Sequence, residues 1–284
     1  MKIEVLKGKE IGKTRALYEE VFQDSREYTD YFYEKVQREG TAFAAEENNE
    51  VISELFLIPK HLICNNKIIE VLYVYGVATK TQYRGQGCMD RLMKEALYYA
   101  KESSTELLYL IPVSTALYDK YGFHTVKQGE VRIWQLSEKE STEMMQYNFE
   151  SVFEFGDKLY QEINGLEKSI KKSLELHAFS CIYPLRDREY LVDRICRAKI
   201  EGGGMYLIRS QNGKVTGFVI TGEEEREIVI MDVAGEYEKK EEIIKSFMKW
   251  QGRRRMKEYV FTIMIKELKE SMKNIVWNTL NDEI

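Results

Sequence analysis

The apolar positions between residues 71 and 100 change their spacing once, from that of a buried strand to that of a helix. Residues 71–79 form a nearly unbroken apolar and aromatic run rich in β-branched side chains, as expected for a strand buried on both faces. Apolar side chains then recur at helical spacing, at Met89, Leu92, Met93, Ala96, Leu97 and Ala100. The pattern predicts a strand, a short turn and a helix.

The turn between this strand and helix has the composition of a phosphate-binding loop. It reads Gln-Tyr-Arg-Gly-Gln-Gly-Cys over residues 82–88. The N-terminus of a helix attracts anions, the two glycines allow a phosphate to approach the backbone, and Arg84 adds a positive charge. A Walker A loop is excluded because Gly-Lys-Ser/Thr is absent, and a dinucleotide fingerprint would need a third glycine. We expect a phosphate or pyrophosphate ligand, with an ordinary glycine-containing turn as the alternative.

The segments before this strand predict one strand, two helices and a β-hairpin. We expect a strand over residues 1–6, helices over 9–22 and 25–37 with a cap at Asp24 and Ser25, and hairpin strands over 41–45 and 51–58. After Pro59, residues 61–66 are expected to turn again. Three tyrosines on the second helix either pack on the sheet, which we favour, or line a substrate cleft: Tyr28, Tyr31 and Tyr33.

The segment after the helix predicts one more strand and a short helix. Residues 107–111 form an apolar run, which we interpret as a strand. Ser114 is a plausible helix N-cap and Gly122 a plausible residue after a helix C-terminus, so a short helix is expected to end at Tyr121.

Two motifs resemble those of the GCN5-related N-acetyltransferase (GNAT) superfamily. The loop at residues 84–89, Arg-Gly-Gln-Gly-Cys-Met, is similar to the family's pyrophosphate loop Arg/Gln-x-x-Gly-x-Gly/Ala, and residues 117–123 resemble its Leu-Tyr-x-x-x-Gly-Phe signature. The order of the elements is also similar to that fold. Met89 departs from the usual small residue, as in members of the enhanced-intracellular-survival (Eis) type. The resemblance is specific over about residues 40–125.

This resemblance implies an α/β fold with a mixed central sheet flanked by helices, whose fourth and fifth strands splay apart around acetyl-CoA. The pantetheine arm would bond to the main chain of Val77, Ala78 and Thr79. The pyrophosphate would contact the loop residues Arg84, Gly85, Gln86, Gly87, Cys88, Met89 and Asp90. Tyr118 corresponds to the family's general acid, since a phenol beside the sulfur can protonate a departing thiolate. Tyr121 is the expected packing residue of that segment.

The sequence identifies neither the general base nor the acceptor. Some family members carry a glutamate where Tyr73 and Leu110 stand here, so no base can be assigned. Glu54, Glu70 and the terminal carboxylate of Ile284 remain alternatives. The acceptor is expected to be a primary amine of a small molecule or a peptide, and Tyr28, Tyr31 and Tyr73 are candidate substrate contacts. The acidic composition favours a cationic small molecule.

The second half of the chain is expected to be a degenerate copy of the first. We predict a strand over residues 129–136 that closes the first domain (1–136), a polar linker, and a second domain over 144–284. This domain would contain helices over about 144–176 and 187–200, a hairpin at 205–221 and a strand at 227–233. Aligning residues 233–248 with 78–93 places Glu238, Lys239 and Glu241 over Arg84, Gly85 and Gly87. We expect no CoA binding there, because the carboxylates would repel a pyrophosphate.

Composition narrows the class of protein. The 284 residues are 44% hydrophobic and 31% charged with a net charge of −5, which argues against nucleic acid as a partner. The basic run at residues 253–255 is expected to be a solvated face of the protein and not a nucleic-acid site. No segment predicts a signal peptide or membrane span, so a cytoplasmic protein is expected. The four scattered cysteines predict reduced thiols and no metal site. Eis-type proteins usually add a sterol-carrier-like domain, for which this chain is too short, and a homo-oligomer is left open.

The functional alternative to an N-acetyltransferase is a non-catalytic CoA-binding sensor on the same fold. Both functions require the loop at Arg84, whereas only an enzyme requires a proton donor at Tyr118. A third possibility, a nucleotide-binding α/β domain, predicts that ATP or NAD competes with CoA.

Overall fold

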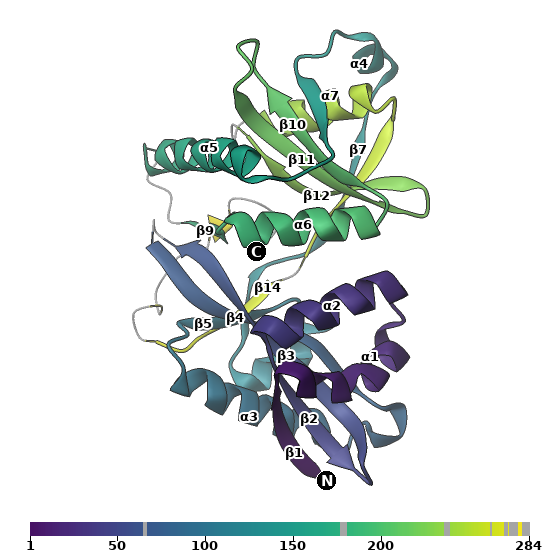
Figure 1. Ribbon diagram of the computed structural model, residues 1–284, viewed down its shortest axis with the longest axis vertical. Coiled ribbons are helices and arrows are strands. Elements are labelled where there is room, and N and C mark those ends of the chain that lie inside the picture. The colour runs from purple at the N-terminus through teal and green to yellow at the C-terminus, as the bar shows by residue number, and fades with distance from the viewer. Residues whose placement is uncertain are drawn as a thin grey trace.

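Two mixed β-sheets, each with helices on both faces, make up the computed structural model (Figure 1). It describes residues 1–64, 67–176, 181–235, 239–261, 263–269, 272 and 278–279. None of the helices in these ranges is long and apolar enough to cross a bilayer.

The first sheet has the strand order β1-β2-β3-β4-β5-β14-β6, and β3 also pairs with β9, which pairs with β15. Its strands are β1 (Lys2–Lys7), β2 (Thr41–Glu47), β3 (Glu50–Cys64), β4 (Lys67–Thr79), β5 (Leu107–Leu110), β6 (His124–Lys127), β9 (Cys181–Pro184), β14 (Ile263–Glu267) and β15 (Asn278–Thr279). One face packs on α1 (Arg15–Phe22) and α2 (Arg26–Glu39), and the other on α3 (Cys88–Glu102). Most neighbouring strands are antiparallel, whereas β4 and β5 run parallel.

The N-terminal elements follow the predicted pattern with one difference. Ser25 caps α2 by accepting a hydrogen bond from the amide of Tyr28, and Asn48 and Asn49 form the hairpin turn with positive φ angles of 52° and 61°. The first half of the predicted helix over 9–22 is instead a 3-10 helix, η1 (Gly8–Thr14). Its packing against the sheet through Ile11 and Thr14 accommodates the tighter turn.

The predicted turn is wrong for residues 61–64, because β3 and β4 continue as one long antiparallel pair to Cys64 and Lys67; residues 65 and 66 lie outside the described residues. Pro59 does not end β3, because at this position the edge of β3 that faces away from β4 pairs with no described strand. Pairing with β2 ends at Leu57, and pairing with β9 begins at Leu62. A residue without an N–H group is tolerated at such an open edge.

The second sheet has the order β7-β13-β12-β11-β10-β8. Its strands are β7 (Glu130–Gln135), β8 (Asn148–Val152), β10 (Gly204–Arg209), β11 (Val215–Glu224), β12 (Glu227–Ala234) and β13 (Arg255–Val260). The buried clusters place α5 (Asp157–Leu176) and α6 (Arg188–Ile200) on one face and α7 (Lys240–Trp250) on the other. The predicted helix over about 144–176 is wrong in its first part, because β8 is the edge strand there and α5 begins only at Asp157. The predicted polar linker contains a short helix, α4 (Glu138–Thr142), capped by Ser137.

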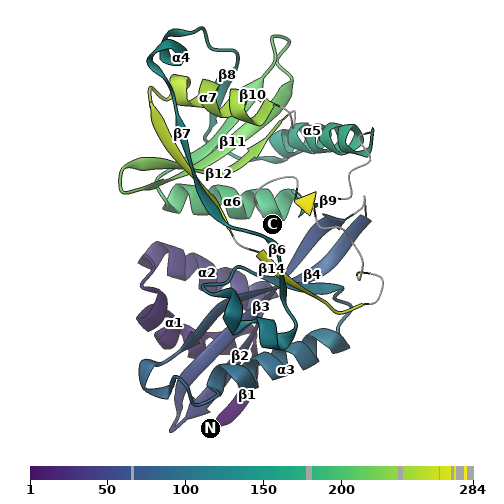
Figure 2. The same ribbon diagram turned by 180° about the vertical axis from the view of Figure 1, so that it is seen from behind.

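Each half of the chain contributes a strand to the sheet of the other half. β7, predicted to close the first domain, pairs with β13 in the second sheet, and β14 lies between β5 and β6 in the first. Figure 2 shows the late strand β14 within the lower sheet and the early strand β7 beside the upper one. The boundary between the sheets therefore does not coincide with a single point in the sequence near residue 140.

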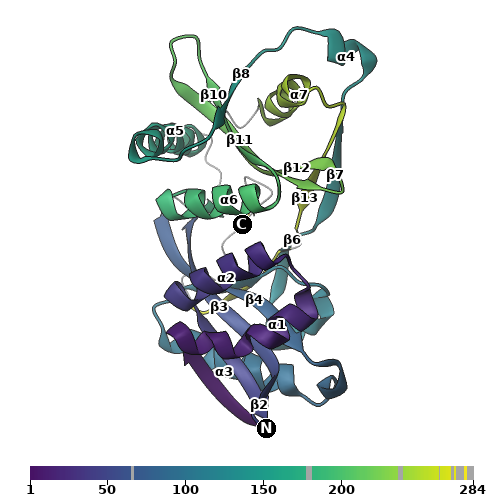
Figure 3. The same ribbon diagram turned by 45° about the vertical axis from the view of Figure 1, so that its right-hand side comes forward.

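Helix α6 of the second half lies next to α2 of the first (Figure 3). Asp193 of α6 accepts hydrogen bonds from the Tyr31 hydroxyl and the Lys35 ammonium of α2. Lys35 and Asp193 are both largely buried, so this ion pair holds the two helices together.

Candidate active site

Strands β4 and β5 separate after Val74. Their parallel pairing covers Val71–Val74 against Leu107–Leu110, and beyond it no described strand pairs with that edge of β4. A bulge lies in the same place, because two residues of β4, Gly76 and Val77, lie opposite the single residue Leu55 of β3. Gly76 in this bulge has a φ of +58°, and a Cβ atom would come within 2.7 Å of the Phe56 ring. The open edge over residues 75–79 contains Val77, Ala78 and Thr79.

The predicted loop connects this edge to α3. Gly85 and Gly87 have φ angles of +75° and +78°, and the space beside both Cα atoms is empty. Gly87 is the N-cap residue of α3 and offers no side chain, so the first amides of the helix stay open to a ligand. Arg84 is exposed and donates from Nε to the Thr79 carbonyl at 3.2 Å. This arrangement fits a phosphate group close to the main chain.

The remaining loop residues have structural contacts of their own. The Gln86 amide donates to the Gln82 carbonyl at 2.9 Å. Cys88 is buried, as expected for a small filler, and Met89 packs against the core beneath α3. Met89, which stands where the family usually has a small residue, therefore points toward the core and away from the open amides of the loop.

Asp90 ties the first turn of α3 to the segment after β5. Its carboxylate binds Lys94 at 2.7 Å and Lys120 at 3.1 Å, and it accepts a hydrogen bond from the Tyr121 hydroxyl at 3.1 Å. These bonds, with the ammonium of Lys94 foremost, lower the pKa of Asp90 to about 2. The two lysines add positive charge next to the loop and were not predicted from the sequence. The i, i+4 spacing of Asp90 and Lys94 could have indicated one of these ion pairs.

The predicted short helix before Gly122 is instead two 3-10 turns, η3 (Thr115–Leu117) and η4 (Asp119–Tyr121). Ser114 makes no capping bond, whereas Gly122 ends the segment with a φ of +80° as predicted. Tyr118 joins the two turns. Tighter turns over so few residues bring both Tyr118 and Tyr121 onto the core.

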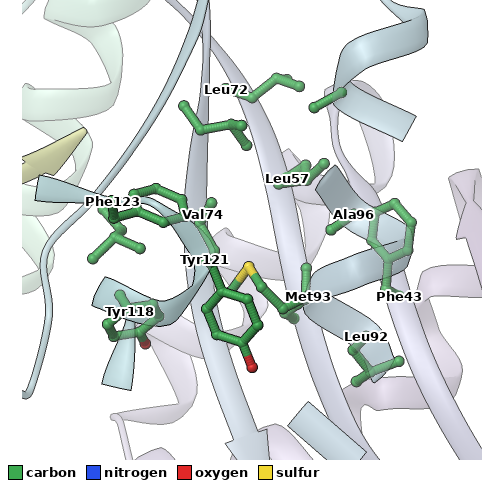
Figure 4. Close-up of a cluster of buried hydrophobic side chains, with 14 of the residues drawn as sticks. Phe43, Leu57, Leu72, Val74, Leu92, Met93, Ala96, Tyr118, Tyr121 and Phe123 are labelled. Atoms are coloured by element: carbon green, nitrogen blue, oxygen red, sulfur yellow. The ribbon is translucent and has the colours of Figure 1, made fainter. Parts of the chain in front are cut away.

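Tyr118 belongs to the buried cluster that contains Val74 and Leu110, the last residues of the β4–β5 pairing. Its ring meets that of Phe123 edge-on at 6.2 Å between centroids, and Figure 4 shows both side chains in this cluster. Only 7% of its surface is exposed, and no described residue hydrogen-bonds to its hydroxyl. Burial, with a smaller effect of Tyr121, raises the pKa of Tyr118, so the phenol stays protonated at neutral pH.

A group of tyrosines covers the opposite face of β4, under α1 and α2. Tyr73 stacks on Tyr109 of β5 at 4.7 Å, and the Tyr75 hydroxyl is 3.1 Å from that of Tyr18 and 3.4 Å from that of Tyr28. Tyr28, Tyr31 and Tyr73 are the predicted substrate contacts, and all three are half-buried. Tyr31 bonds to the second domain, whereas Tyr33 is a core residue bonded to Thr14.

Neither of the two described candidate carboxylates, Glu54 and Glu70, is placed to act as a general base at this site. Glu70 lies six residues before Gly76 on an extended strand, about 20 Å away, and accepts a hydrogen bond from Ser104. Glu54 is fully buried, and burial raises its pKa well above the ordinary value, so it is protonated and cannot accept a proton. Ile284 lies outside the described residues.

The second sheet repeats the order of a strand followed by a helix, but its helix begins at a residue with a side chain. β12 and β13 pair in parallel as β4 and β5 do, and α7 follows β12. Lys239 is the N-cap of α7 in place of a glycine, and Glu241 stands in its first turn. Tyr237 and Glu238 of the predicted alignment lie outside the described residues. Among the described residues, no group of His, Cys, Asp or Glu is arranged to hold a metal ion.

Comparison with known proteins identifies the first domain. Residues 2–126 match the family model described as an acetyltransferase (GNAT) domain. The N-terminal part of the chain is a GNAT domain. The predicted family and the predicted α/β fold are therefore confirmed, and the family supports acyl or acetyl transfer in general. No curated protein sequence matches the chain.

Solved structures share the fold of the whole chain. A conserved protein of unknown function from Enterococcus faecalis V583, titled a probable N-acyltransferase, is 14% identical with a TM-score of 0.75 over 94% of this chain and 72% of that one. Eis1 from Mycobacterium abscessus is 7% identical with a TM-score of 0.63, over 94% and 73%. A tandem GNAT protein from the clavulanic acid biosynthesis pathway is 10% identical with a TM-score of 0.57, over 94% and 99%. The likeness extends the GNAT fold to a tandem of two such units.

Proposed function

We propose that the protein is an acetyl-CoA-dependent N-acetyltransferase whose first domain carries the reaction. The observation that supports this most is the open edge of β4 after Val74, which leads directly into the uncapped N-terminus of α3 at Gly87. An extended pantetheine arm would pair with the edge at Val77, Ala78 and Thr79. The pyrophosphate would then meet the amides of the loop from Gly85 to Asp90, beside the charge of Arg84.

Transfer proceeds by direct attack in a ternary complex. The neutral amine of the acceptor attacks the thioester carbonyl carbon, a C–N bond forms, and the C–S bond breaks. The Tyr118 hydroxyl donates its proton to the departing sulfur, and the nitrogen loses a proton to water. The position of Tyr118 in the cluster with Val74 and Leu110, the last residues of the β4–β5 pairing, supports this role, because its protonated phenol lies close to where the strands separate. Positioning of the amine against the thioester supplies much of the remaining acceleration.

Cofactor binding is tested with Gly87→Glu. A glutamate there places a negative charge against the open amides of α3 and forces a side chain into a positive φ. We expect acetyl-CoA and CoA to raise the melting temperature of the wild type, ATP and NAD to leave it unchanged, and the variant to lose the shift. Gly213→Glu is the matched control, since Gly213 has a φ of +81° and equally empty surroundings in the second domain. An equal response to ATP, or an unchanged response in Gly87→Glu, would contradict the loop assignment.

Catalysis is tested with Tyr118→Phe, which also separates the enzyme from a CoA-binding sensor. Loss of a general acid is expected to lower kcat by about 10²- to 10⁴-fold while the melting shift with acetyl-CoA is retained. Tyr121→Phe is the control, because that hydroxyl bonds to Asp90 and has no role in the transfer. Acetylation at the wild-type rate in Tyr118→Phe would remove Tyr118 from the mechanism, and the absence of any acetylated amine would favour the sensor.

A further inference from the structure

Arg197 of α6 faces the tyrosine group of the first domain. Its guanidinium carbon lies 5.5 Å from the centre of the Tyr28 ring. The Tyr28 hydroxyl is 3.4 Å from that of Tyr75, whose ring lies 5.5 Å from that of Tyr73. The guanidinium therefore lies at the edge of the tyrosine group of β4, on the side of the second domain.

The hydrogen-bonding capacity of Arg197 is largely unused. Its Nε is buried, and no hydrogen bond from the described residues reaches it. The ion pair to Glu201 spans 3.8 Å from Nη2 to Oε1, which is too long for a hydrogen bond. The carboxylate of Asp193, one turn earlier, is already bound to Lys35 and Tyr31. The Arg197 side chain is 35% exposed, so its Nη groups can reach a ligand that supplies the missing acceptors.

Local charge here differs from the charge of the whole chain. The net charge of −5 favoured a cationic acceptor, yet the charged group that lies over Tyr28 is the guanidinium of Arg197, while the Asp193 carboxylate is paired with Lys35. Interactions at contact distance outweigh those of distant surface charges, which water and salt screen. Arg197 would repel a cationic acceptor from this side of Tyr28.

We propose that Arg197 binds a carboxylate of the acceptor, so that the substrates are amines that also carry a carboxylate, such as amino acids. This inference rests on the proposed acetyltransferase function. A guanidinium that lies over an aromatic ring leaves its N–H edge free for a planar, bidentate partner, which a carboxylate provides. With the carboxylate at Arg197, the amine of the same molecule would extend along the tyrosine group to the open edge of β4, where the thioester is proposed to lie.

Matched acceptors that differ only in the carboxylate test this assignment. Acetylation of L-phenylalanine and β-alanine is compared with that of their primary amides, with spermidine as a cationic acceptor. The wild type is expected to prefer the acids by about 10- to 100-fold in kcat/KM, the range of one charge-assisted bidentate contact. Arg197→Gln should lose this preference mainly through a higher KM, and Arg197→Lys should restore part of it. Arg188→Gln is the control, since Arg188 lies on α6 but pairs with Asp157 at the surface.

A second readout separates this inference from the proposed function. The melting temperature is measured with CoA and each acid or amide, so that acceptor binding is seen without turnover. Stabilisation by the acids that Arg197→Gln abolishes supports the carboxylate site even if no amine is acetylated, in which case only the enzymatic function fails. Better turnover of amides or spermidine than of acids, or an acid preference that survives in Arg197→Gln, overturns the inference while the acetyltransferase function stands. Arg197→Lys covers the case in which the glutamine variant does not fold.

Discussion

Glu54 offers the sharpest test of the packing under α1 and α2. It lies in the middle of β3, opposite Ala44 of β2 and Ala78 of β4. Its exposed surface is 0%, and neither carboxylate oxygen has a hydrogen-bond partner among the described residues. Burial raises its pKa well above the ordinary 4.5. The folded protein therefore holds Glu54 as a neutral acid.

The sign of the pH dependence follows from this shift. Below pH 4.5 the carboxyl is protonated in both the folded and the unfolded chain, so it causes no pH dependence. Between 4.5 and the raised pKa, only the folded state keeps the proton. The free energy of unfolding therefore falls by about 1.4 kcal/mol for each pH unit in this window. Glu54→Gln cannot ionise, so it should gain stability relative to the wild type by the same amount per pH unit.

Urea unfolding of the wild type and Glu54→Gln at pH 5, 6 and 7 measures this difference directly. Other titrating groups are common to both proteins and cancel when the two free energies are subtracted. Glu34→Gln on the exposed side of α2 should show no such trend, because Glu34 is in contact with water in both states. A difference between Glu54→Gln and the wild type that does not change with pH would refute the reasoning, since it would mean that Glu54 ionises normally in the folded protein.

Two further predictions concern the second domain and the exchanged strand. Asp232→Ala should lower the free energy of unfolding by about 3–5 kcal/mol, because Asp232 forms a buried two-bond pair with Arg186 at 2.8 and 3.0 Å. Adding Arg186→Leu to this variant should recover most of the loss in a urea titration. A loss below about 1 kcal/mol in Asp232→Ala would mean that the pair is open to water. Met264→Ala should lower the free energy of unfolding by about 2–5 kcal/mol, because this residue of β14 is fully buried in the core beneath α3. The control Met145→Ala, at an exposed position, should leave it unchanged. Equal urea midpoints for the two variants would contradict the placement of β14.

The features predicted best from the sequence are those that depend only on residues close together in the chain. The strand at Val71–Thr79, the glycine turn and α3 are contiguous, and the residue pattern of each predicts a single type of secondary structure. The cap at Ser25 and the end at Gly122 are equally local. Gly76 was overlooked inside an apolar run, although a glycine in a strand is itself a signal of a bulge. The strand was predicted, but the place where it opens was not.

Other features depend on partners far along the chain. The apolar run Ile263-Met264-Ile265 fits a strand of either sheet, and only the pairing with Leu110 and Thr125 decides between them. Arg197 shows the same limit for the site. It stands on a helix of mixed polarity, where a charged residue is ordinarily solvated, and its surroundings depend on which face of α6 meets α2.

The exchange of strands bears on how the site is held together. Because β14 completes the first sheet and β7 the second, neither sheet is complete without a segment from the other half. The chain crosses between the sheets from β6 to β7 and again from β13 to β14. These two crossings, with the Lys35–Asp193 ion pair, limit rotation of α6 against α2. The position of Arg197 over Tyr28 is thereby restricted by the fold itself, which is the condition for the proposed site to bind an acceptor with one domain and acetylate it on the other.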